Sequence, residues 1–353
     1  MLRNFSALAI TMALTSHAFS QDGDSTKKGN LAISGSVDAY YRYNFHNAKD
    51  QDQVNNFTSF TDTHNSFELG MASIRADYTI GRVTAVADLG FGKRAADFSY
   101  PDDGIMAGVK QAYVSVNATD NLTFSMGKWA THVGYELADA YLNRNYSMSY
   151  MFSYGPFSHT GLKAELTAGN FGFMLGVANP SDLVSASFGK KWILGQASWS
   201  ASSFAAYLNY QGGKWEDETQ VHQVDMVLTN TFSDLFSAGV NATLQSVKPE
   251  NNGGGETWKG AALYLNVDPS KTFGLTLRGE YFDDKKGVSG LSSATGIPTS
   301  VFAATLSGNI RIDNLTIIPE FRLDNAKEEI FIKNAGGGVK NSSTFILAAT
   351  YHF

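Results

Sequence analysis

The chain has 353 residues, a formal net charge of -6 and no cysteine, with 34 glycines, 7 prolines and 13% aromatic residues. Its length suits one large domain or two ordinary ones. Because no strongly basic patch is present, nucleic acid is excluded as an expected partner. The lack of cysteine removes disulfides, thiolate zinc sites and cysteine nucleophiles, and it suits a protein exported through an oxidising compartment.

Residues 1–20 have the pattern of a secretory signal peptide. The basic Arg3 precedes an apolar stretch, and Ala18 and Ser20 stand at the small-residue positions before a cut ahead of Gln21. We therefore predict that this segment is removed and takes no part in the fold.

The mature chain is expected to begin with a polar leader. Residues 21–29 read QDGDSTKKG, which predicts a mobile segment. After it, no window approaches the roughly 18 consecutive apolar residues that a membrane helix requires. An exported chain of this kind is periplasmic, secreted or an outer-membrane β-barrel, and residues 30–353 are the segment that would form the barrel.

Apolar and polar residues alternate along most of residues 30–353. From Leu31 to Phe45 one parity is apolar and the other polar, which is the period of a strand and not of a helix. The pattern resumes in segments that begin at Val83, Leu122, Phe171, Phe204, Phe236, Phe273, Phe302 and Phe345. Patterns typical of helices are nearly absent.

The connections between these segments alternate in length. Seven are short, near residues 80–82, 118–121, 168–170, 200–202, 233–235, 268–271 and 313–314. Eight are long and mostly polar, at residues 46–65, 93–106, 129–157, 179–189, 212–219, 248–256, 283–299 and 326–341. This arrangement predicts about sixteen strands with both ends of the sheet on the short-turn side, as in outer-membrane barrels.

A soluble β-sandwich or propeller is the alternative fold, but neither has a reason to make every second connection long. In lipid a sheet must close on itself, because each backbone polar group needs an internal partner. We therefore predict an all-β fold, a transmembrane antiparallel β-barrel. Aromatic residues near predicted strand ends are expected in its interfacial girdles, namely Tyr40, Tyr41, Trp192 and Trp199.

Charged residues recur on the polar parity. On a lipid-facing surface each would cost roughly 2 to 4 kcal/mol near the midplane, so this parity is expected to line water. Opposite charges two residues apart are expected to form ion pairs that brace the wall; the alternative is a field that filters solutes by charge. The predicted wall charges are Asp38, Arg42, Asp88, Lys163, Glu165, Asp225, Arg278, Glu280, Arg311, Glu320, Arg322 and Asp324.

The longest connection, from Trp129 to Phe157, is too apolar and aromatic for a loop exposed to water. We predict that it folds into the barrel and narrows the channel, with a short helical turn over residues 137–142. An external lid or a strand extension is the alternative. The candidate constriction residues are Glu136, Asp139 and Arg144, with His132, Asn143 and Asn145 beside them.

Enzymatic motifs are missing from the sequence. The histidines are scattered, with no HExxH pattern, so neither a metal nor a cofactor is expected. Neither GxSxG nor a Walker loop occurs. We predict that the chain is not an enzyme; an embedded hydrolase that uses His132 with Ser147, or His159 with Ser158, is the remaining catalytic alternative.

Three stretches carry a resemblance to a known family. Residues 127–166 contain Gly134 and Glu136 as a G-x-E element, then Asn143, an aromatic run at 152–155 and the segment HTGL at 159–162. Residues 318–324 read IPEFRLD, and the sequence ends TYHF. In these stretches the chain resembles the OmpL-like type-2 β-barrel porins, in a form typical of Bacteroidota.

The resemblance implies an outer-membrane porin through which small hydrophilic solutes and ions diffuse passively. Its expected partners are membrane lipid and the barrel-assembly machinery, for which Tyr351 and Phe353 resemble the terminal recognition signal. A homotrimer is a candidate assembly, because porin-like barrels are often trimers. Pro319 falls within a predicted strand, where it predicts a bulge or a broken pairing.

Two other functions stay open. One is a solute-specific channel, for instance for carbohydrate, in which tyrosines of the longest connection form a stacking track: Tyr135, Tyr141, Tyr146 and Tyr150. The other is a surface or structural barrel with a plugged lumen and no transport role.

Overall fold

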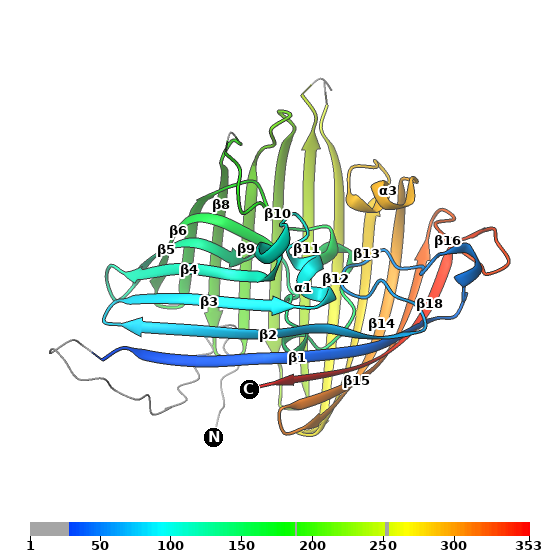
Figure 1. Cartoon of the computed structure of the whole chain (residues 1–353), viewed down its shortest axis with the longest axis horizontal. Helices are drawn as coiled ribbons and strands as arrows, with labels where there is room; N and C mark the ends of the chain where they lie inside the picture. The colour runs from blue at the N-terminus through cyan, green and yellow to red at the C-terminus, as the bar shows by residue number, and fades with distance from the viewer. Residues whose placement is uncertain (1–27, 188, 251–253) are drawn as a thin grey trace.

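The computed structural model describes residues 28–187, 189–250 and 254–353. The predicted signal peptide and residues 21–27 of the predicted leader lie outside these ranges. Sixteen strands form one closed antiparallel barrel (Figure 1). They are β1 (Asn30–Asn44), β2 (Ser66–Ile80), β3 (Val83–Phe91), β4 (Val109–Asn117), β5 (Leu122–Ala130), β6 (Ser158–Ala168), β7 (Phe171–Ala178), β8 (Trp192–Ala201), β9 (Phe204–Lys214), β10 (Gln220–Thr231), β11 (Phe236–Lys248), β12 (Glu256–Ser270), β13 (Phe273–Asp284), β14 (Thr299–Ile312), β15 (Leu315–Ala326) and β18 (Asn341–His352).

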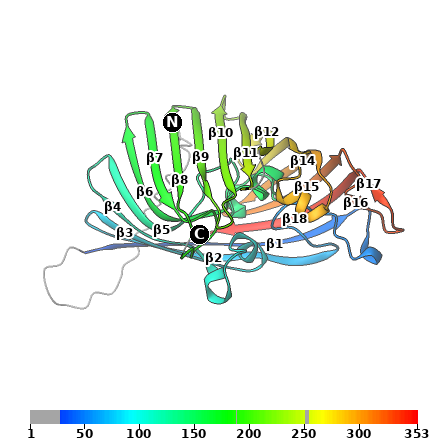
Figure 2. The same ribbon diagram turned by 90° about the horizontal axis from the view of Figure 1, so that it is seen from above.

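The barrel closes where the first strand meets the last. β1 pairs with β18 from Ser36 opposite His352 to Asn44 opposite Thr344. Figure 2 shows the strands following one another around the ring, with the red β18 beside the blue β1. Every other strand pairs with its neighbours in the chain order of the barrel, and the prediction of about sixteen antiparallel strands is confirmed.

Alternation along each strand separates two faces of the wall. On β13, Leu275 and Leu277 are 38% and 44% exposed, whereas the intervening Thr276 and the next residue, Arg278, are 1% and 0% exposed. The apolar residues therefore point outward, where lipid is the favourable solvent, and the polar residues point into the barrel. The alternation of apolar and polar residues in the sequence therefore predicted a membrane barrel correctly.

The connections alternate in length as predicted. Seven turns have two to four residues, and eight loops have 5 to 27 residues. The loops carry short helices α1 (Lys93–Phe98), α2 (Tyr150–Ser153) and α3 (Gly290–Thr295), the 3-10 turns η1 (Lys49–Gln51), η2 (Gly104–Gly108) and η3 (Ala140–Leu142), and a hairpin of β16 (Phe331–Ile332) and β17 (Gly338–Val339). The helical turn predicted over residues 137–142 is therefore the shorter η3. Within the described ranges, no helix is long and apolar enough to span a membrane.

Two local irregularities match their sequence signals. Pairing of β15 with β14 lapses between Ser307–Glu320 and Ile310–Ile317 without a register shift, because Pro319 has no N–H to donate. The prediction of a locally broken pairing, and not of a bulge, is therefore the correct one. On β2 a bulge leaves Gly70 unpaired opposite β1. It lies next to residues 71–74, where the sequence departs from clean alternation of apolar and polar residues.

Two of the four predicted girdle residues are wrong. Tyr40 and Trp192 are 2% and 1% exposed and point into the barrel. Tyr40 packs on the ring of Tyr146, and Trp192 donates its indole N–H to the carbonyl of Lys214. Both therefore contribute to internal packing instead of the lipid interface.

Candidate functional site

The β5–β6 loop, residues 131–157, contacts the inner face of the wall at many strands. The wall residues of these contacts come from β1 and from strands between β9 and β18. Many of the contacts therefore join residues more than 100 positions apart in the sequence. The contacts are His132 with the Tyr210 carbonyl, the Gly134 N–H with Asp225, Arg144 with Asp268, Glu136 with Arg278, Asn145 with Ser307, the Tyr146 N–H with Glu320, Tyr141 with His352, and Tyr146 with Asp38.

Two buried wall carboxylates bind consecutive backbone N–H groups of this loop. Glu320 accepts from the N–H of Tyr146 at 2.7 Å and of Ser147 at 3.1 Å. Glu280 accepts from the N–H groups of residues 150 and 151, both at 2.9 Å. A loop packed against a wall has backbone donors that cannot reach water, and ionised acceptors satisfy them strongly. These two carboxylates therefore fix the path of the loop.

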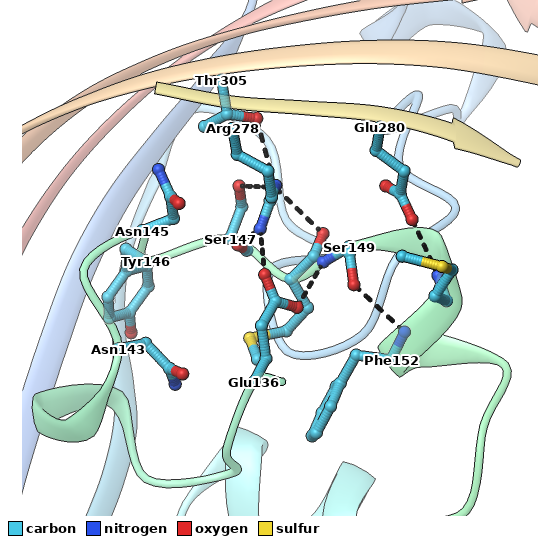
Figure 3. Close-up of polar contacts among 12 residues, drawn as sticks. Glu136, Asn143, Asn145, Tyr146, Ser147, Ser149, Phe152, Arg278, Glu280 and Thr305 are labelled. Carbon is cyan, nitrogen blue, oxygen red and sulfur yellow. Dashed lines mark hydrogen bonds and ion pairs between the residues drawn. The ribbon is translucent and has the colours of Figure 1, made fainter. Parts of the chain in front are cut away.

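Arg278 is the centre of the same contact. Its Nη1 donates to Glu136 Oε1 at 2.5 Å and to the Ser147 carbonyl at 2.7 Å, and its Nη2 donates to Thr305 Oγ1 at 3.1 Å (Figure 3). Glu136 in turn accepts from the N–H of Ser149 at 2.7 Å. The guanidinium and both loop partners are buried. The expected wall pair of Arg278 with Glu280 is not formed, because each binds the loop instead.

The stretch IPEFRLD on β15 contacts this loop as well. Arg322 donates to the Met148 carbonyl at 2.7 Å and lies over the ring of Tyr150 at 5.1 Å. Asp324 holds the guanidinium in place at 2.8 Å. Two stretches that carried the family resemblance, about 170 residues apart in the sequence, are thus in direct contact through Glu320 and Arg322.

A further carboxylate holds the end of the loop from outside the strands. Asp182, in the β7–β8 loop, accepts from the N–H of Phe157 at 2.7 Å and of Ser158 at 2.8 Å, and from the hydroxyl of Tyr100 at 3.3 Å. Burial raises the pKa of Asp182 to about 6. Nothing in the local sequence pattern distinguishes Asp182 from an exposed loop aspartate, so its role could not be predicted.

The predicted constriction residues are placed differently from one another. Glu136 is 4% exposed and bound to Arg278, so it is an anchor and not a charge in the opening. Asn143 binds the backbone of residues 137 and 139, and Asp139 pairs with Lys110 at 2.5 Å. Arg144 keeps 26% of its side chain exposed.

His132 is also an internal contact. Its Nε2 lies 3.1 Å from the Tyr210 carbonyl, so this nitrogen carries the hydrogen and donates. Burial lowers the pKa of His132 to about 4, which keeps the imidazole neutral. Ser147 hydrogen-bonds to Arg278 and not to His132. Within the described ranges, no group of three or more His, Asp or Glu residues has a metal-binding arrangement.

All twelve predicted wall charges lie on the inward parity. Lys163 pairs with Glu165 at 2.9 Å, as expected for a bracing pair. Asp38 and Arg42 do not pair: Asp38 accepts from the hydroxyl of Tyr146, and Arg42 donates to three backbone carbonyls of the β1–β2 loop. The others bind wall or loop groups: Asp88 with Lys110 and Gln111, Asp225 with Asn209 and Asn241, and Arg311 with Asp268.

Only some of the inner charges reach solvent. The pairs Arg75–Asp77 and Lys163–Glu165 have side chains between 16% and 44% exposed. The cluster of Arg144, Asp268 and Arg311 has side chains 26% to 29% exposed. Except for Arg144, which belongs to the β5–β6 loop, these groups lie on strands near their short-turn ends. Arg75 and Asp77 were missed, although their spacing of two residues is the signal that identified the other pairs.

Aromatic side chains cover the opposite, long-loop end. Phe60, Phe98, Phe152 and Phe157, from three different loops, form a buried cluster. In the β5–β6 loop, Tyr146 and Tyr150 are 0% and 1% exposed. The predicted stacking track therefore loses two of its four tyrosines, because their rings are already packed against protein.

Solved structures share this architecture. The anion-selective porin from Comamonas acidovorans is 12% identical, with a TM-score of 0.61 over 92% of this chain and 100% of that chain. The trimer form of OmpT, an outer membrane protein of Vibrio cholerae, is 14% identical, with a TM-score of 0.59 over 92% and 99%. Outer-membrane expressed OmpT of Vibrio cholerae gives 0.58 at 14% identity over 94% and 99%. These likenesses concern the fold.

No curated protein matches the sequence. One family profile does, over residues 30–353, which is the whole of the barrel. This is a family of porins, so its match indicates a channel and not an enzyme. The chain thus belongs to the family described as "Putative beta-barrel porin-2, OmpL-like", and it is a porin of the bacterial outer membrane.

Proposed function

We propose that this porin lets small hydrophilic solutes diffuse passively through its lumen, and that residues 131–157 fold into the lumen as its constriction. The observation that carries the proposal is the set of buried contacts between this loop and the inner wall. Arg278, Glu280 and Glu320 each hold the loop backbone or its side chains. A loop held in this way sets a fixed size limit, since it cannot swing aside with each passing solute.

Weak charge selectivity is expected. The inner groups that stay partly exposed carry both signs, as in the pairs Arg75–Asp77 and Lys163–Glu165. The fields of neighbouring opposite charges largely cancel, and salt screens what is left beyond roughly 8 Å at physiological ionic strength. Size is therefore the main criterion of passage in this proposal.

The test is conductance across a planar lipid bilayer with the purified, refolded chain. Discrete steps that fall as sugars of increasing size are added would support a size-limited channel, and a reversal potential in a salt gradient would report its ion preference. A barrel that folds, as judged by heat-modifiable gel mobility, but passes no current would overturn the proposal.

A structural barrel without transport is the second candidate. The buried aromatic cluster of Phe60, Phe98, Phe152 and Phe157 favours it, because these rings fill space at the long-loop end. The same recording separates the two functions. A measurable current through the wild-type barrel would contradict a permanently closed lumen.

We also propose the export and assembly steps that the sequence predicts. Residues 1–20 would be removed as a signal peptide, so the mature protein would begin at Gln21. Tyr351 and Phe353 would serve as the signal for the barrel-assembly machinery, membrane lipid would cover the apolar face, and the assembly would be a homotrimer. N-terminal sequencing of the mature protein, outer-membrane yield of Phe353→Ala and the mass of the detergent-solubilised complex test these points.

A further inference from the structure

Charges on the outer face of the described strands gather in one part of the wall. The charged strand residues that point outward and are at least partly exposed are Lys214, Lys248, Lys259 and Asp283. They belong to β9, β11, β12 and β13, and each stands near the end of its strand that adjoins a long loop (Figure 1). A charge that faces hydrocarbon is costly, so these side chains must meet a polar environment.

Lys259 stands at the edge of the apolar surface. In the strand register it lies opposite Leu244 of β11, which is 44% exposed, and opposite Asp283 of β13. The next outward residue of β13 toward the short turns is Tyr281, which is 42% exposed. A lysine at such an edge lays its carbon chain along apolar residues and places its ammonium among lipid headgroups.

Lys285 reaches the same place from the loop after β13. Its Nζ donates to Asp283 Oδ2 and to the Tyr281 hydroxyl, both at 3.1 Å, and lies 5.8 Å from the centroid of that ring. Asp283 therefore holds the ammonium of Lys285 on the outer face, near its own register partner Lys259. An ammonium has three N–H donors, so one donor of Lys285 remains after these two contacts.

The lysine patch, as we call this group, consists of Lys248, Lys259, Lys285 and Asp283. It carries a net positive charge, because three lysines face one aspartate. Within residues 28–187, 189–250 and 254–353, neither Lys248 nor Lys259 forms an ion pair, and the nearby carboxylates already have partners, Glu218 in Lys214 and Glu256 in Lys286. The counter-ions of two ammonium groups must therefore come from outside the chain.

We propose that the lysine patch binds the phosphate headgroup of an anionic lipid in the outer leaflet. The long loops of an outer-membrane barrel face the exterior, so the patch lies at the level of that leaflet, where lysines attract anionic lipids. The phosphate accepts from the ammonium groups of Lys259 and Lys285, and the acyl chains follow the apolar face past Tyr281. This inference goes beyond transport and is independent of whether the lumen conducts.

Lipid retention by the refolded protein in neutral detergent micelles tests the patch. Phosphatidylglycerol, which has a net negative headgroup, is compared with phosphatidylcholine, which has none, and bound lipid is counted by native mass spectrometry. Combining Lys248→Gln, Lys259→Gln and Lys285→Gln is expected to weaken phosphatidylglycerol binding at least about tenfold and to leave phosphatidylcholine binding unchanged. Phosphatidylglycerol binding equal to that of the wild type overturns the proposal.

The matched control removes the same number of charges outside the patch. Lys49→Gln, Lys271→Gln and Lys327→Gln change three exposed lysines of other loops and turns, and together they are expected to leave binding at the wild-type level. An equal loss in this control overturns the site, because it shows attraction by overall charge.

Two further measurements complete the test. Inorganic phosphate alone, added at constant ionic strength, is expected not to displace phosphatidylglycerol; displacement overturns the assignment to a lipid. If the triple variant fails to fold, as judged by heat-modifiable gel mobility, Lys259→Gln decides. A loss of about fivefold in phosphatidylglycerol binding, restored in Lys259→Arg, supports the site, and wild-type binding in Lys259→Gln contradicts it.

Discussion

On β15, Arg322 and Asp324 form an ion pair of 2.8 Å with side chains 5% and 7% exposed. On β2, Arg75 and Asp77 form a pair of the same length and spacing with side chains 30% and 32% exposed. The first pair is covered by the β5–β6 loop and binds its backbone. The second faces the open part of the lumen. Strand alternation thus sets the geometry of both pairs. Whether a pair binds protein or stays partly exposed to solvent depends on whether a loop covers it.

The energetic consequence of this difference is large. Exposed pairs contribute about 0 to 1 kcal/mol, because water solvates the separated partners well. Removing one partner of a buried pair costs about 3 to 5 kcal/mol, because the other charge stays desolvated. The covered side of the wall should therefore carry the stability of the loop, and the open side should carry the electrostatics of passage.

The largest expected effect is that of Arg278→Met. This change leaves Glu136 as a buried, unpaired carboxylate, so we expect the free energy of unfolding to fall by about 3 to 5 kcal/mol. Denaturant unfolding in detergent micelles measures it. Arg75→Met on the open side is the control, with an expected loss below about 1 kcal/mol. Equal losses of unfolding free energy in Arg278→Met and Arg75→Met would contradict the distinction between the covered and the open side of the wall.

Asp182 is a buried carboxylate that binds the β5–β6 loop from another loop, so the free energy of unfolding should depend on pH through this residue. Its pKa is about 6 in the folded chain, above the value of about 3.9 for an unfolded aspartate, so the folded state binds the proton more tightly. The stability it contributes is present below about pH 3.9 and is lost as pH rises through about 6. Relative to Asp182→Asn, the wild type should lose up to roughly 3 kcal/mol between about pH 4 and pH 7. A constant difference between the two proteins would contradict this.

Glu320→Gln sharpens the comparison without deleting a side chain. The neutral amide has one acceptor oxygen for the N–H groups of Tyr146 and Ser147, so we expect a loss of about 1.5 to 3 kcal/mol. Hydrogen exchange at residues 146–147 should accelerate as well. Glu165→Gln, on the open side, should leave exchange at these two amides as it is in the wild type.

The smallest stability effects are expected at Lys163 and Glu165, where selectivity should respond instead. Glu165→Gln removes an exposed negative charge and should move the reversal potential toward anions, and Lys163→Gln should move it toward cations. Each should change the free energy of unfolding by less than about 1 kcal/mol. Reversal potentials that stay at the wild-type value in both variants would show that this pair lies away from the permeation path.

The strands and their faces could be predicted because lipid imposes one rule on every strand. An outward residue that faces hydrocarbon must be apolar, so Leu275 and Leu277 identify the outer face of β13. Thr276 and Arg278, on the other parity, must then point inward. The number of strands was predicted from a second signal, the alternation of short and long connections along the sequence. Tyr40 is on the inward parity, so its error came from weighing residue type above parity.

The contacts of the loop could not be predicted from the sequence. The spacing of Arg278 and Glu280 indicates a local pair, but each side chain binds a segment more than 125 residues away. Local spacing specifies which groups share a wall, whereas the choice among partners depends on which loop covers that wall. Glu136 was found as a loop charge and misjudged as exposed because its partner lies on β13.

The position of these partners in the chain also constrains how the protein forms. Tyr146 and Met148 are fastened by Glu320 and Arg322, which follow them by 174 residues. A nascent chain presents the loop long before the residues that anchor it exist. The stretch from Tyr146 to Met148 can therefore bind β15 only after the last part of the chain has been made. Its binding to β15 and the closure of the barrel by β18 both depend on the final strands.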